Sequence, residues 1–398
     1  MTKLCVVTTL SKTLCYLHRG QFEYLKNHGF EVWGVAGPGD GHEQLHEMGV
    51  PTKVIPMTRE ITPLRDLIAL IRLWWFFLTN RFDVVHFSTT KAAFLSSIAS
   101  LLAGVRRRFY TCRGRLYLPE SSLKYKIFIV YQRFVFRLCT RCIFICHELK
   151  AWMVHRRLCP PTKGSVIGSG SSNGVDLKRF SRTEYNVRKG MEIRQELGLN
   201  EDGLMILSVG RLRREKGINE LVEAYSELAE DYPNVHLLLV GNYEQQDSLK
   251  PETLSSIDRH PRIHRIKWIT EPSTAYAAAD IVAFPSYQEG FGNVSIEASA
   301  MGVPVVSTDI LGCRESTKNG VTGILVPPEE AAPLRDALKR LIDDPAMRRR
   351  LGANGRKRVE REFPSERIWQ GMVQQYRSLM DVGQFPDTLA PPAENSRK

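Results

Sequence analysis

The chain has 398 residues, 43% hydrophobic and 25% charged, which is long enough for two globular domains. Its formal net charge of +12 is concentrated at one end, because residues 1–180 hold 26 Lys and Arg against 11 Asp and Glu, and the rest holds 29 against 32. No run of 18 apolar residues occurs, which argues against a membrane-spanning helix, and a start in MTKLCVVTTL without a leader-like segment favours free thiols for the eight cysteines.

Short aliphatic runs alternate with helical segments along the chain, a pattern typical of parallel sheets covered by helices. In the first half we expect strands at 4–9, 30–36, 53–56, 83–88, 107–112, 142–146 and 164–167, and helices at 18–28, 64–80 and 91–103. In the second half we expect strands at 204–210, 235–241, 263–267, 280–285, 303–307 and 323–326, and helices at 217–231, 293–301, 329–343 and 345–362.

The two halves are separated by GSGSSNGVDLKRFSR, residues 168–182, which is rich in Gly, Ser and Asn and is predicted to be a loop or hinge. We therefore expect an α/β protein of two Rossmann-like domains, 1–180 and 181–364, facing each other across a cleft. A helix at about 365–380 is expected to pack back on the first domain. The polar, proline-bearing stretch 384–398 is expected to be disordered.

Two segments of the basic half mix aromatic residues with Arg or Lys: LIALIRLWWFFLTNRF at 67–82 and KYKIFIVYQRFVFRLCTR at 124–141. We expect the first to pack mainly in the core. For the second, which carries Lys124, Lys126 and Arg133, a core helix and a helix lying on a bilayer surface both remain open. A basic half also permits nucleic acid, a phosphorylated substrate or a merely solvated surface, but without a recognition helix or an RNA platform we expect no nucleic-acid partner.

Three cysteines stand close together in RLCTRCIFIC, at Cys139, Cys142 and Cys146. A structural metal site needs a fourth ligand at matching spacing, and the sequence offers no second pair. The IFIC run is also predicted to be a buried strand, which would turn its side chains to alternating faces. Since there is no plausible Asp-x-Asp pair either, we expect no metal.

The segment PSYQEGFGNVSIEASAMGVPVVST, 285–308, combines a buried strand end, a Gly-bearing loop and a helix start. The free N–H groups at a helix N-terminus and glycines beside them form a seat for phosphate, here around Gly290, Phe291, Gly292 and Asn293. Asn293 can also act as the helix cap. Glu297 lies about one helical turn further and suits the paired hydroxyls of a ribose, and Glu289 in the loop would point at a sugar.

Two cations follow another predicted strand in SVGRLRREKGINELVEAY, 208–225. The strand ends at Gly210, and Arg211 and Lys216 flank the turn into a helix. A guanidinium fork and an ammonium at that position can hold a diphosphate. The neighbouring Arg213 and Arg214 are expected to be only solvated.

These motifs resemble those of family 4 glycosyltransferases: PSYQEGFGNVSIEA is similar to their E-x7-E motif and VGRLRREKG to their pyrophosphate-binding turn. ADIVAFPS at 279–286 and NGVTGILVPP at 319–328 match as well. GSGSSNGVDLKRF and VVHFSTTKAA resemble a bacterial branch that builds capsule, exopolysaccharide and lipid-linked glycans. The resemblance spans about residues 3–380 and implies the GT-B fold and retention of anomeric configuration.

The resemblance also implies roles for residues. Glu297 would hold the donor's ribose and Glu289 the hydroxyls of its sugar, while Arg211 and Lys216, after Gly210, would hold the diphosphate with the backbone of Phe291 to Asn293. The segment RIKWITEP, 265–272, which contains Ile269, would flank the base, and Glu315 would lie near the donor.

The sequence departs from the family pattern in two places. The first loop, TTLSKTLCYLHRG, lacks the common Gly-Gly pair, and TCRGRLY has Arg113 where many relatives have His. We count Arg113 among the catalytic residues on this basis. Alternatively, Arg113 and Arg115 bind a diphosphate of the acceptor or the donor, and Arg115 is placed on the acceptor side with the basic residues of 124–141.

Together these features predict a metal-independent retaining transferase that moves a hexose or N-acetylhexosamine from a UDP-sugar to a polyprenyl-diphosphate-linked saccharide. With no nucleophile apparent, a front-face route is expected. The N-terminal half would bind the acceptor at the cytosolic face of an anionic membrane, with no cofactor besides the UDP-sugar co-substrate. Two alternatives remain: a non-catalytic nucleotide-sugar-binding protein, and another GT-B enzyme such as a UDP-sugar epimerase, which GSGSSNGVDLKRF disfavours.

Overall fold

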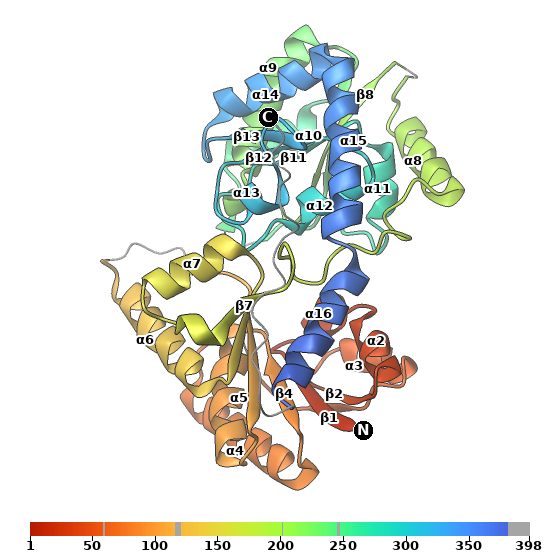
Figure 1. The fold of residues 1–398 in the computed structure, drawn as a ribbon. Helices are drawn as coiled ribbons and strands as arrows, with labels where there is room; N and C mark the ends of the chain where they lie inside the picture. The colour runs from red at the N-terminus through yellow and green to blue at the C-terminus, as the bar shows by residue number, and fades with distance from the viewer. Residues whose placement is uncertain (59, 116–120, 201, 245–246, 381–398) are drawn as a thin grey trace, which may run out of the picture. The chain divides into compact units, whose positions relative to one another are not determined.

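A computed structural model describes residues 1–58, 60–115, 121–200, 202–244 and 247–380, and the chain divides into two compact units (Figure 1). Unit 1 comprises Met1–Gly174 and the chain from Ser365 onward, and unit 2 comprises Val175–Pro364. The boundary lies before the predicted residue 180, because the N–H of Val175 donates to the carbonyl of Phe363 at 2.8 Å and the ring of Phe180 packs edge-on against Tyr276. The predicted disordered stretch 384–398 lies outside the described residues.

Unit 1 is built on a parallel sheet, which has seven strands in the described part of the chain, in the order β3-β2-β1-β4-β5-β6-β7. The strands are β1 (Thr2–Val7), β2 (Phe30–Ala36), β3 (Thr52–Val54), β4 (Val84–Phe87), β5 (Arg107–Cys112), β6 (Arg141–Phe144) and β7 (Gly164–Val166). The central strands β1, β2, β4, β5 and β6 are mostly buried, as expected for aliphatic strands covered on both faces, whereas the edge strand β3 is mostly exposed. The order reverses between β1 and β4, so the loops that follow these two strands diverge and leave room for a ligand.

The helices of unit 1 are α1 (Ser11–Leu17), α2 (Gln21–Asn27), α3 (Gly41–Glu47), α4 (Pro63–Asn80), α5 (Thr90–Leu102), α6 (Leu123–Leu138), α7 (His147–His155), the 3₁₀ turn η1 (Pro161–Lys163) and α16 (Ser365–Ser378). The predicted helix at 18–28 is in fact shorter, and the preceding segment, taken as a loop, forms α1. The helix α16 packs in unit 1 beside α2 (Figure 1), where the ring of Trp369 lies 5.5 Å from that of Tyr24.

Unit 2 holds a second parallel sheet, six-stranded within the residues described, in the order β10-β9-β8-β11-β12-β13. Its strands are β8 (Leu204–Val209), β9 (Val235–Val240), β10 (Ile263–Ile266), β11 (Ile281–Phe284), β12 (Val305–Thr308) and β13 (Gly323–Val326). Its helices are α8 (Glu184–Glu196), η2 (Arg214–Lys216), α9 (Ile218–Asp231), α10 (Pro251–Arg259), α11 (Ser273–Ala278), α12 (Asn293–Ala300), α13 (Cys313–Ser316), α14 (Ala331–Asp343) and α15 (Pro345–Glu362). Here the order reverses between β8 and β11.

Each unit has its own hydrophobic core. In unit 1 the core joins strands β1 and β2 to α1, α2 and α16, which contributes Ile368, Met372, Val373 and Tyr376. The buried hydroxyl of Tyr376 lies 2.6 Å from Nδ1 of His86 on β4, so the last helix of the chain is tied to the middle of the sheet. In unit 2 the core runs between the sheet and the helices α9, α10 and α14.

Candidate functional site

The predicted donor residues of unit 2 come together at the reversal between β8 and β11. The loop after β8 and the loop after β11 are joined by backbone contacts, because the N–H of Tyr287 donates to the carbonyl of Glu215 at 2.9 Å. Gly217 has φ +68°, and a Cβ there would lie 2.0 Å from the carbonyl oxygen of Pro285. Only glycine permits this approach, which holds the two predicted motifs against each other.

Lys216 and Glu289, one from each loop, form an ion pair with Nζ and Oε1 2.5 Å apart. Both side chains are largely buried, each with 18% of its surface exposed. The sequence placed Lys216 on a diphosphate and Glu289 on a sugar. The structure brings the two side chains into contact with each other. A ligand with both a diphosphate and a sugar would therefore have to break this ion pair, so that Lys216 contacts the phosphates and Glu289 a sugar hydroxyl.

Arg211, after Gly210 at the end of β8, is also paired. Its Nη1 donates to both carboxylate oxygens of Glu244, at 2.8 and 3.1 Å, and half of the side chain is exposed. The expectation that Arg213 is solvated is wrong. Arg213 pairs with Glu215 and Glu244 and is 16% exposed, because the turn folds it under the loop. Its neighbour Arg214 is 62% exposed.

The helix α12 begins where the sequence predicts a phosphate seat, but its cap differs. Gly292, with φ +85°, is the N-cap, and Asn293 is the first helical residue, so the predicted capping role of Asn293 is wrong. A glycine at the N-cap has no side chain that could occupy the amides at the start of the helix. The ring of Phe291 is buried against Phe363, so only the backbone of Gly290, Phe291 and Gly292 is available there.

Glu297 lies one turn into α12, and its Oε2 accepts a hydrogen bond from the hydroxyl of Tyr276 at 2.9 Å. Burial raises the pKa of Glu297 to about 7, against the lowering effects of this hydrogen bond and of Arg179. The hydrogen bond holds the carboxyl group in place, and burial makes it much harder to ionise than an exposed glutamate. When ionised, the carboxylate of Glu297 can accept hydrogen bonds from both hydroxyls of a diol.

The remaining predicted donor residues lie around this seat. Ile269 is half-buried in the segment after β10, which Arg179 holds by donating to the carbonyl of Thr270 and the carboxylate of Glu271, both at 2.8 Å. Glu315 lies in α13. The loop before it is packed so tightly that a Cβ on Gly312 would lie 2.6 Å from the backbone nitrogen of Phe291.

Among the residues that the structure describes, no group of three or more His, Cys, Asp or Glu side chains has the arrangement of a metal site. All eight cysteines are free thiols. The absence of a metal requirement thus stays a prediction, and the positive groups on hand for a diphosphate are Arg211, Lys216 and the N-terminus of α12.

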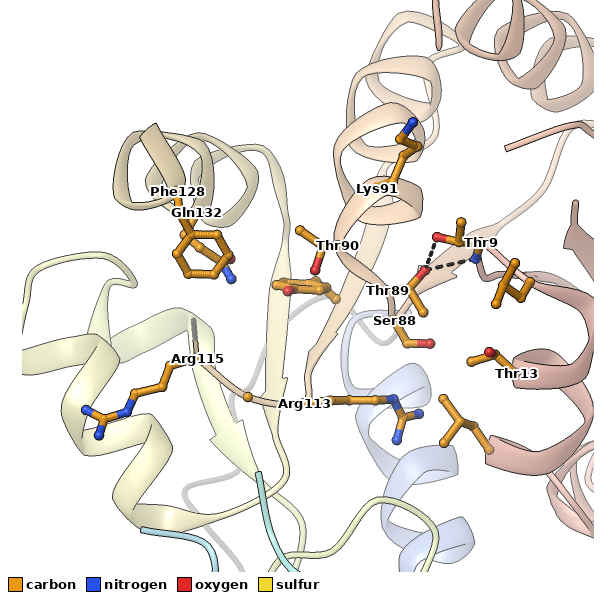
Figure 2. Close-up of a pocket in the computed structure, with 14 residues that line it drawn as sticks. Thr9, Thr13, Ser88, Thr89, Thr90, Lys91, Arg113, Arg115, Phe128 and Gln132 are labelled. Atoms are coloured by element: carbon orange, nitrogen blue, oxygen red, sulfur yellow. Dashed lines mark hydrogen bonds between the residues drawn. The ribbon is translucent and has the colours of Figure 1, made fainter. Parts of the chain in front are cut away.

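Unit 1 has a pocket of about 550 Å³ beyond the ends of β1, β4 and β5, again at the reversal of strand order. Figure 2 shows that its polar wall comes from the segments that follow these strands. That wall includes Thr9, Thr13, Ser88, Thr89, Thr90, Arg113 and Lys91, whose ammonium is paired with Asp66 at 2.7 Å. Phe128 and Gln132 of α6 close the other side.

The two arginines after β5 separate. The side chain of Arg113 points toward Thr13, whereas that of Arg115 points away (Figure 2) and stacks on Trp152, with its guanidinium carbon 5.2 Å from the ring centre. A joint grip of both arginines on one diphosphate is therefore not the arrangement present. The basic residues predicted for the acceptor side, Lys124, Lys126 and Arg133, lie on the exposed face of α6.

The expectation that residues 67–82 pack mainly in the core is wrong for one face of α4. Leu64, Leu67, Ile68, Ile71, Trp75 and Leu78 are all more than 40% exposed. On α6 the exposed apolar residues Leu123, Ile127, Val130 and Phe134 alternate with the basic ones. Neither helix, nor any other in the described parts of the chain, is long and apolar enough to cross a membrane.

Known proteins match both units. Residues 22–179 fit the family profile Glycosyltransferase Family 4, and residues 191–358 fit the profile Glycosyl transferases group 1. Over 378 residues the chain is 31% identical to the capsular polysaccharide biosynthesis glycosyltransferase CapM of Staphylococcus aureus, covering 95% of this chain and 97% of that protein. The chain is a family 4 glycosyltransferase.

Two further similarities agree with this assignment. The chain is 28% identical over 334 residues to the UDP-Gal:alpha-D-GlcNAc-diphosphoundecaprenol alpha-1,3-galactosyltransferase of Escherichia coli, covering 81% of this chain and 83% of that one. The crystal structure of HepE of Anabaena in complex with UDP superimposes with a TM-score of 0.77 at 22% identity, over 95% of this chain and 100% of that one. The predicted GT-B fold is thereby confirmed.

In this family 4 glycosyltransferase, sequence reasoning missed the groups that hold the predicted residues. Tyr276 supports Glu297, and Glu244 and Glu215 hold the arginines after β8. Ser88 and Thr9 of the unit 1 pocket were missed as well. Their positions at the carboxyl ends of the predicted strands 83–88 and 4–9 were the available signal, since ligands in such sheets bind beyond the carboxyl ends of strands.

Proposed function

We propose that this glycosyltransferase moves a sugar from a UDP-sugar to a polyprenyl-diphosphate-linked saccharide, with retention of configuration and without a metal ion. The observation that carries the proposal is the Lys216–Glu289 pair beside the uncapped N-terminus of α12, with Glu297 one turn further. Two of the relatives act in capsule synthesis and on a diphosphoundecaprenol-linked sugar according to their names, which supports the same substrate classes here.

The donor would bind with its ribose on Glu297 and its diphosphate on the first amides of α12. Lys216 would then turn from Glu289 to the phosphates, and Glu289 would accept hydroxyl groups of the sugar. The negative charge that grows on the leaving diphosphate would be stabilised by Lys216, Arg211 and the helix N-terminus, in the place where other transferases use a divalent ion. Because Glu289 would then hold hydroxyl groups of the sugar, it would not act as a nucleophile, and a front-face route would follow.

The acceptor would bind at unit 1 on the cytosolic face of an anionic membrane. Exposed apolar residues on α4 and α6, interleaved with Lys124, Lys126 and Arg133, suit shallow insertion combined with charge attraction. A second pocket of about 550 Å³ beside the end of α6, lined by Arg133, Arg137 and Arg157 among others, adds positive charge to the same region.

The test is UDP release from a panel of UDP-hexoses and UDP-N-acetylhexosamines, with a short prenyl-diphosphate-linked N-acetylglucosamine as acceptor. We expect turnover with one donor, undiminished by EDTA, and an α-linked product from an α-linked donor. Lys216→Met should lower kcat by about a hundredfold or more, because the charge is used mainly in the transition state.

The matched control is Lys318→Met, which removes the same group from an exposed position in unit 2. It should turn over like the unmodified protein. Equal rates for Lys216→Met and Lys318→Met, with both proteins folded, would contradict the proposed role of Lys216, and turnover that stops in EDTA and returns with added magnesium would contradict the metal-free mechanism.

A further inference from the structure

The pocket of unit 1 contains a half-buried positive charge, Arg113, that pairs with no carboxylate among the described residues. Nε and Nη1 of Arg113 are both shielded from solvent and have no hydrogen-bond partner among the described residues. Burial lowers the pKa of Arg113 to about 10, so it remains charged at neutral pH. Among the residues that the structure describes, no Asp or Glu lines the pocket. Burying a charge without a partner is strongly unfavourable, which points to a ligand that supplies the missing acceptors.

The groups around Arg113 also donate hydrogen bonds. The helix α5, of 13 residues, begins at the pocket wall, and no side chain caps it. Its N-cap residue Thr89 is instead engaged with Thr9, with hydroxyl oxygens 2.7 Å apart and the N–H of Thr9 donating at 2.9 Å. The hydroxyl of Ser88 is buried and has no partner in the described structure. Free helix amides, a hydroxyl and a guanidinium form the donor set that recognises phosphate.

Besides burial, the charge of Arg113 also lowers the pKa values of the neighbouring histidines His18 and His86. Burial, and second the charge of Arg113, lower the pKa of His18 to about 3, and the pKa of His86 is likewise held well below its usual value. Both imidazoles are therefore neutral at physiological pH. They add no competing positive charge, so Arg113 is the charged group of this cluster.

We propose that this pocket is a phosphate site that receives the diphosphate of the lipid-linked acceptor. The inference rests on the proposed function, and it adds a subsite for the diphosphate of the acceptor. It assigns Arg113 to the acceptor's diphosphate instead of the reacting sugar, and it gives a reason for arginine at a position where many relatives have histidine.

The acceptor is favoured over the donor because of what borders the pocket. Phe128 and Gln132 line it from α6, the helix whose outer face exposes Ile127, Val130 and Phe134. A diphosphate held at Arg113 would thus have an apolar surface within the same unit for the first part of its prenyl chain. A nucleoside diphosphate has no such chain to place.

The first experiment uses the full-length protein saturated with UDP, so that the seat in unit 2 is filled, and inorganic pyrophosphate as the probe. Pyrophosphate should raise the melting temperature of the unmodified protein but not of Arg113→Met. The matched control is Arg106→Met, an exposed arginine just before the start of β5, whereas Arg113 follows its end. Arg106→Met should respond like the unmodified protein.

The same measurement tests whether Arg113 is merely structural. Without pyrophosphate, Arg113→Met should melt at or above the temperature of the unmodified protein, because a buried unpaired charge has been removed. Should Arg113→Met melt lower and still respond to pyrophosphate like the unmodified protein, the arginine would have a structural role and the proposal would be overturned.

The second experiment separates the two possible sources of the phosphate. Arg113→Met should raise the KM for the prenyl-diphosphate-linked acceptor by about tenfold or more and leave the Kd of UDP unchanged. Weaker UDP binding with an unchanged acceptor KM would assign the pocket to the donor and refute the proposal. If the unmodified protein turns over no acceptor at all, the proposed function fails, and the pyrophosphate response still decides whether the pocket is an anion site.

Discussion

At the scale of single residues, the donor seat is organised by charges that are already paired without a ligand. Lys216 forms an ion pair with Glu289, and Arg211 forms one with Glu244. These ion pairs keep the long side chains in defined positions. They also reduce the electrostatic repulsion between the positive charges of Lys216 and Arg211. On the proposed function, a donor would enter by exchange of partners, which favours a ligand that has phosphate and hydroxyl groups at the right separation over a simple anion.

Glu297 gives a prediction for pH. Burial raises its pKa to about 7, and a ribose diol donates hydrogen bonds that only the ionised carboxylate fully accepts. The affinity for UDP-glucose should therefore rise with pH up to about 7 and then level off, and fall by up to about tenfold per unit below that. Isothermal titration between pH 5.5 and 8.5 measures this. UDP-glucose is the suitable ligand because its two phosphates are both esterified and do not titrate in this range.

The control is Glu297→Gln, which should bind weakly and with no dependence on pH. The sign for stability is opposite to that for binding. A carboxyl group whose pKa is raised in the folded state stabilises the fold at low pH and loses that contribution as pH rises to about 7, so the ligand-free protein should lose stability over this interval and Glu297→Gln should not. An unchanged binding curve in Glu297→Gln would refute the assignment.

At the scale of elements, the junction between β8 and β11 depends on Gly217. We predict that Gly217→Ala lowers the free energy of unfolding by about 2–4 kcal/mol, from the left-handed backbone and from the collision of a Cβ with the carbonyl of Pro285. Because Lys216 is the adjacent residue, kcat/KM should also fall by about a hundredfold. Chemical denaturation and UDP-release kinetics measure the two effects.

Gly198→Ala is the matched control for this substitution. Gly198 has φ +73°, close to the +68° of Gly217, but a Cβ there would meet nothing within 4 Å. It should lower the stability by only about 1–2 kcal/mol, from backbone strain, and leave kcat/KM unchanged. Equal losses in the two variants would show that the contact with Pro285 is not what fixes the junction.

The elements themselves were largely predictable, because strands buried on both faces have uninterrupted aliphatic runs such as LMILSV at β8 and VHLLLV at β9. The helix α1 was missed because it has only seven residues and no side-chain cap. The exposed face of α4 was missed for another reason: its composition does not reveal which of its apolar residues are covered by neighbouring elements.

The site was predictable only where its residues follow a strand. Glu289, Glu297, Arg211 and Lys216 share that signal, and the structure gathers them in one unit. Their supports do not share it, since Tyr276 is 21 residues from Glu297 and Glu244 is 33 from Arg211. Those contacts follow from the order β9-β8-β11, which a single sequence does not fix.

At the scale of the whole molecule, the positive charge is concentrated in the half of the chain that is proposed to bind the membrane and the acceptor. Residues 1–180 carry 26 basic and 11 acidic residues, whereas the donor-binding remainder has 29 and 32. A strongly basic surface attracts anionic lipid, and a nearly neutral donor domain avoids repelling or trapping an anionic nucleotide by long-range charge. The exposed apolar residues of α4 and α6 also lie in the basic part.

This division predicts how the protein binds vesicles. Binding to vesicles with anionic lipid should exceed binding to neutral ones and should weaken as salt is raised, because each lysine near the surface contributes about 1 kcal/mol that salt screens. Lys126→Glu on α6 should lower the affinity by about tenfold or more at low salt. Val130→Glu should lower the affinity for neutral and anionic vesicles alike, since it removes an apolar side chain that would insert into the bilayer. Flotation at low and high salt measures the binding of the unmodified protein and of both variants.

The matched control for Lys126→Glu is Lys53→Glu. Lys53 is exposed on β3, at the edge of the sheet opposite to β7, and its replacement changes the net charge by the same amount. If attraction acts through the whole charge of unit 1, the two variants should lose affinity equally. If the face of α6 docks on the membrane, as we propose, Lys126→Glu should lose much more, and a greater loss in Lys53→Glu would place the docking surface elsewhere on unit 1.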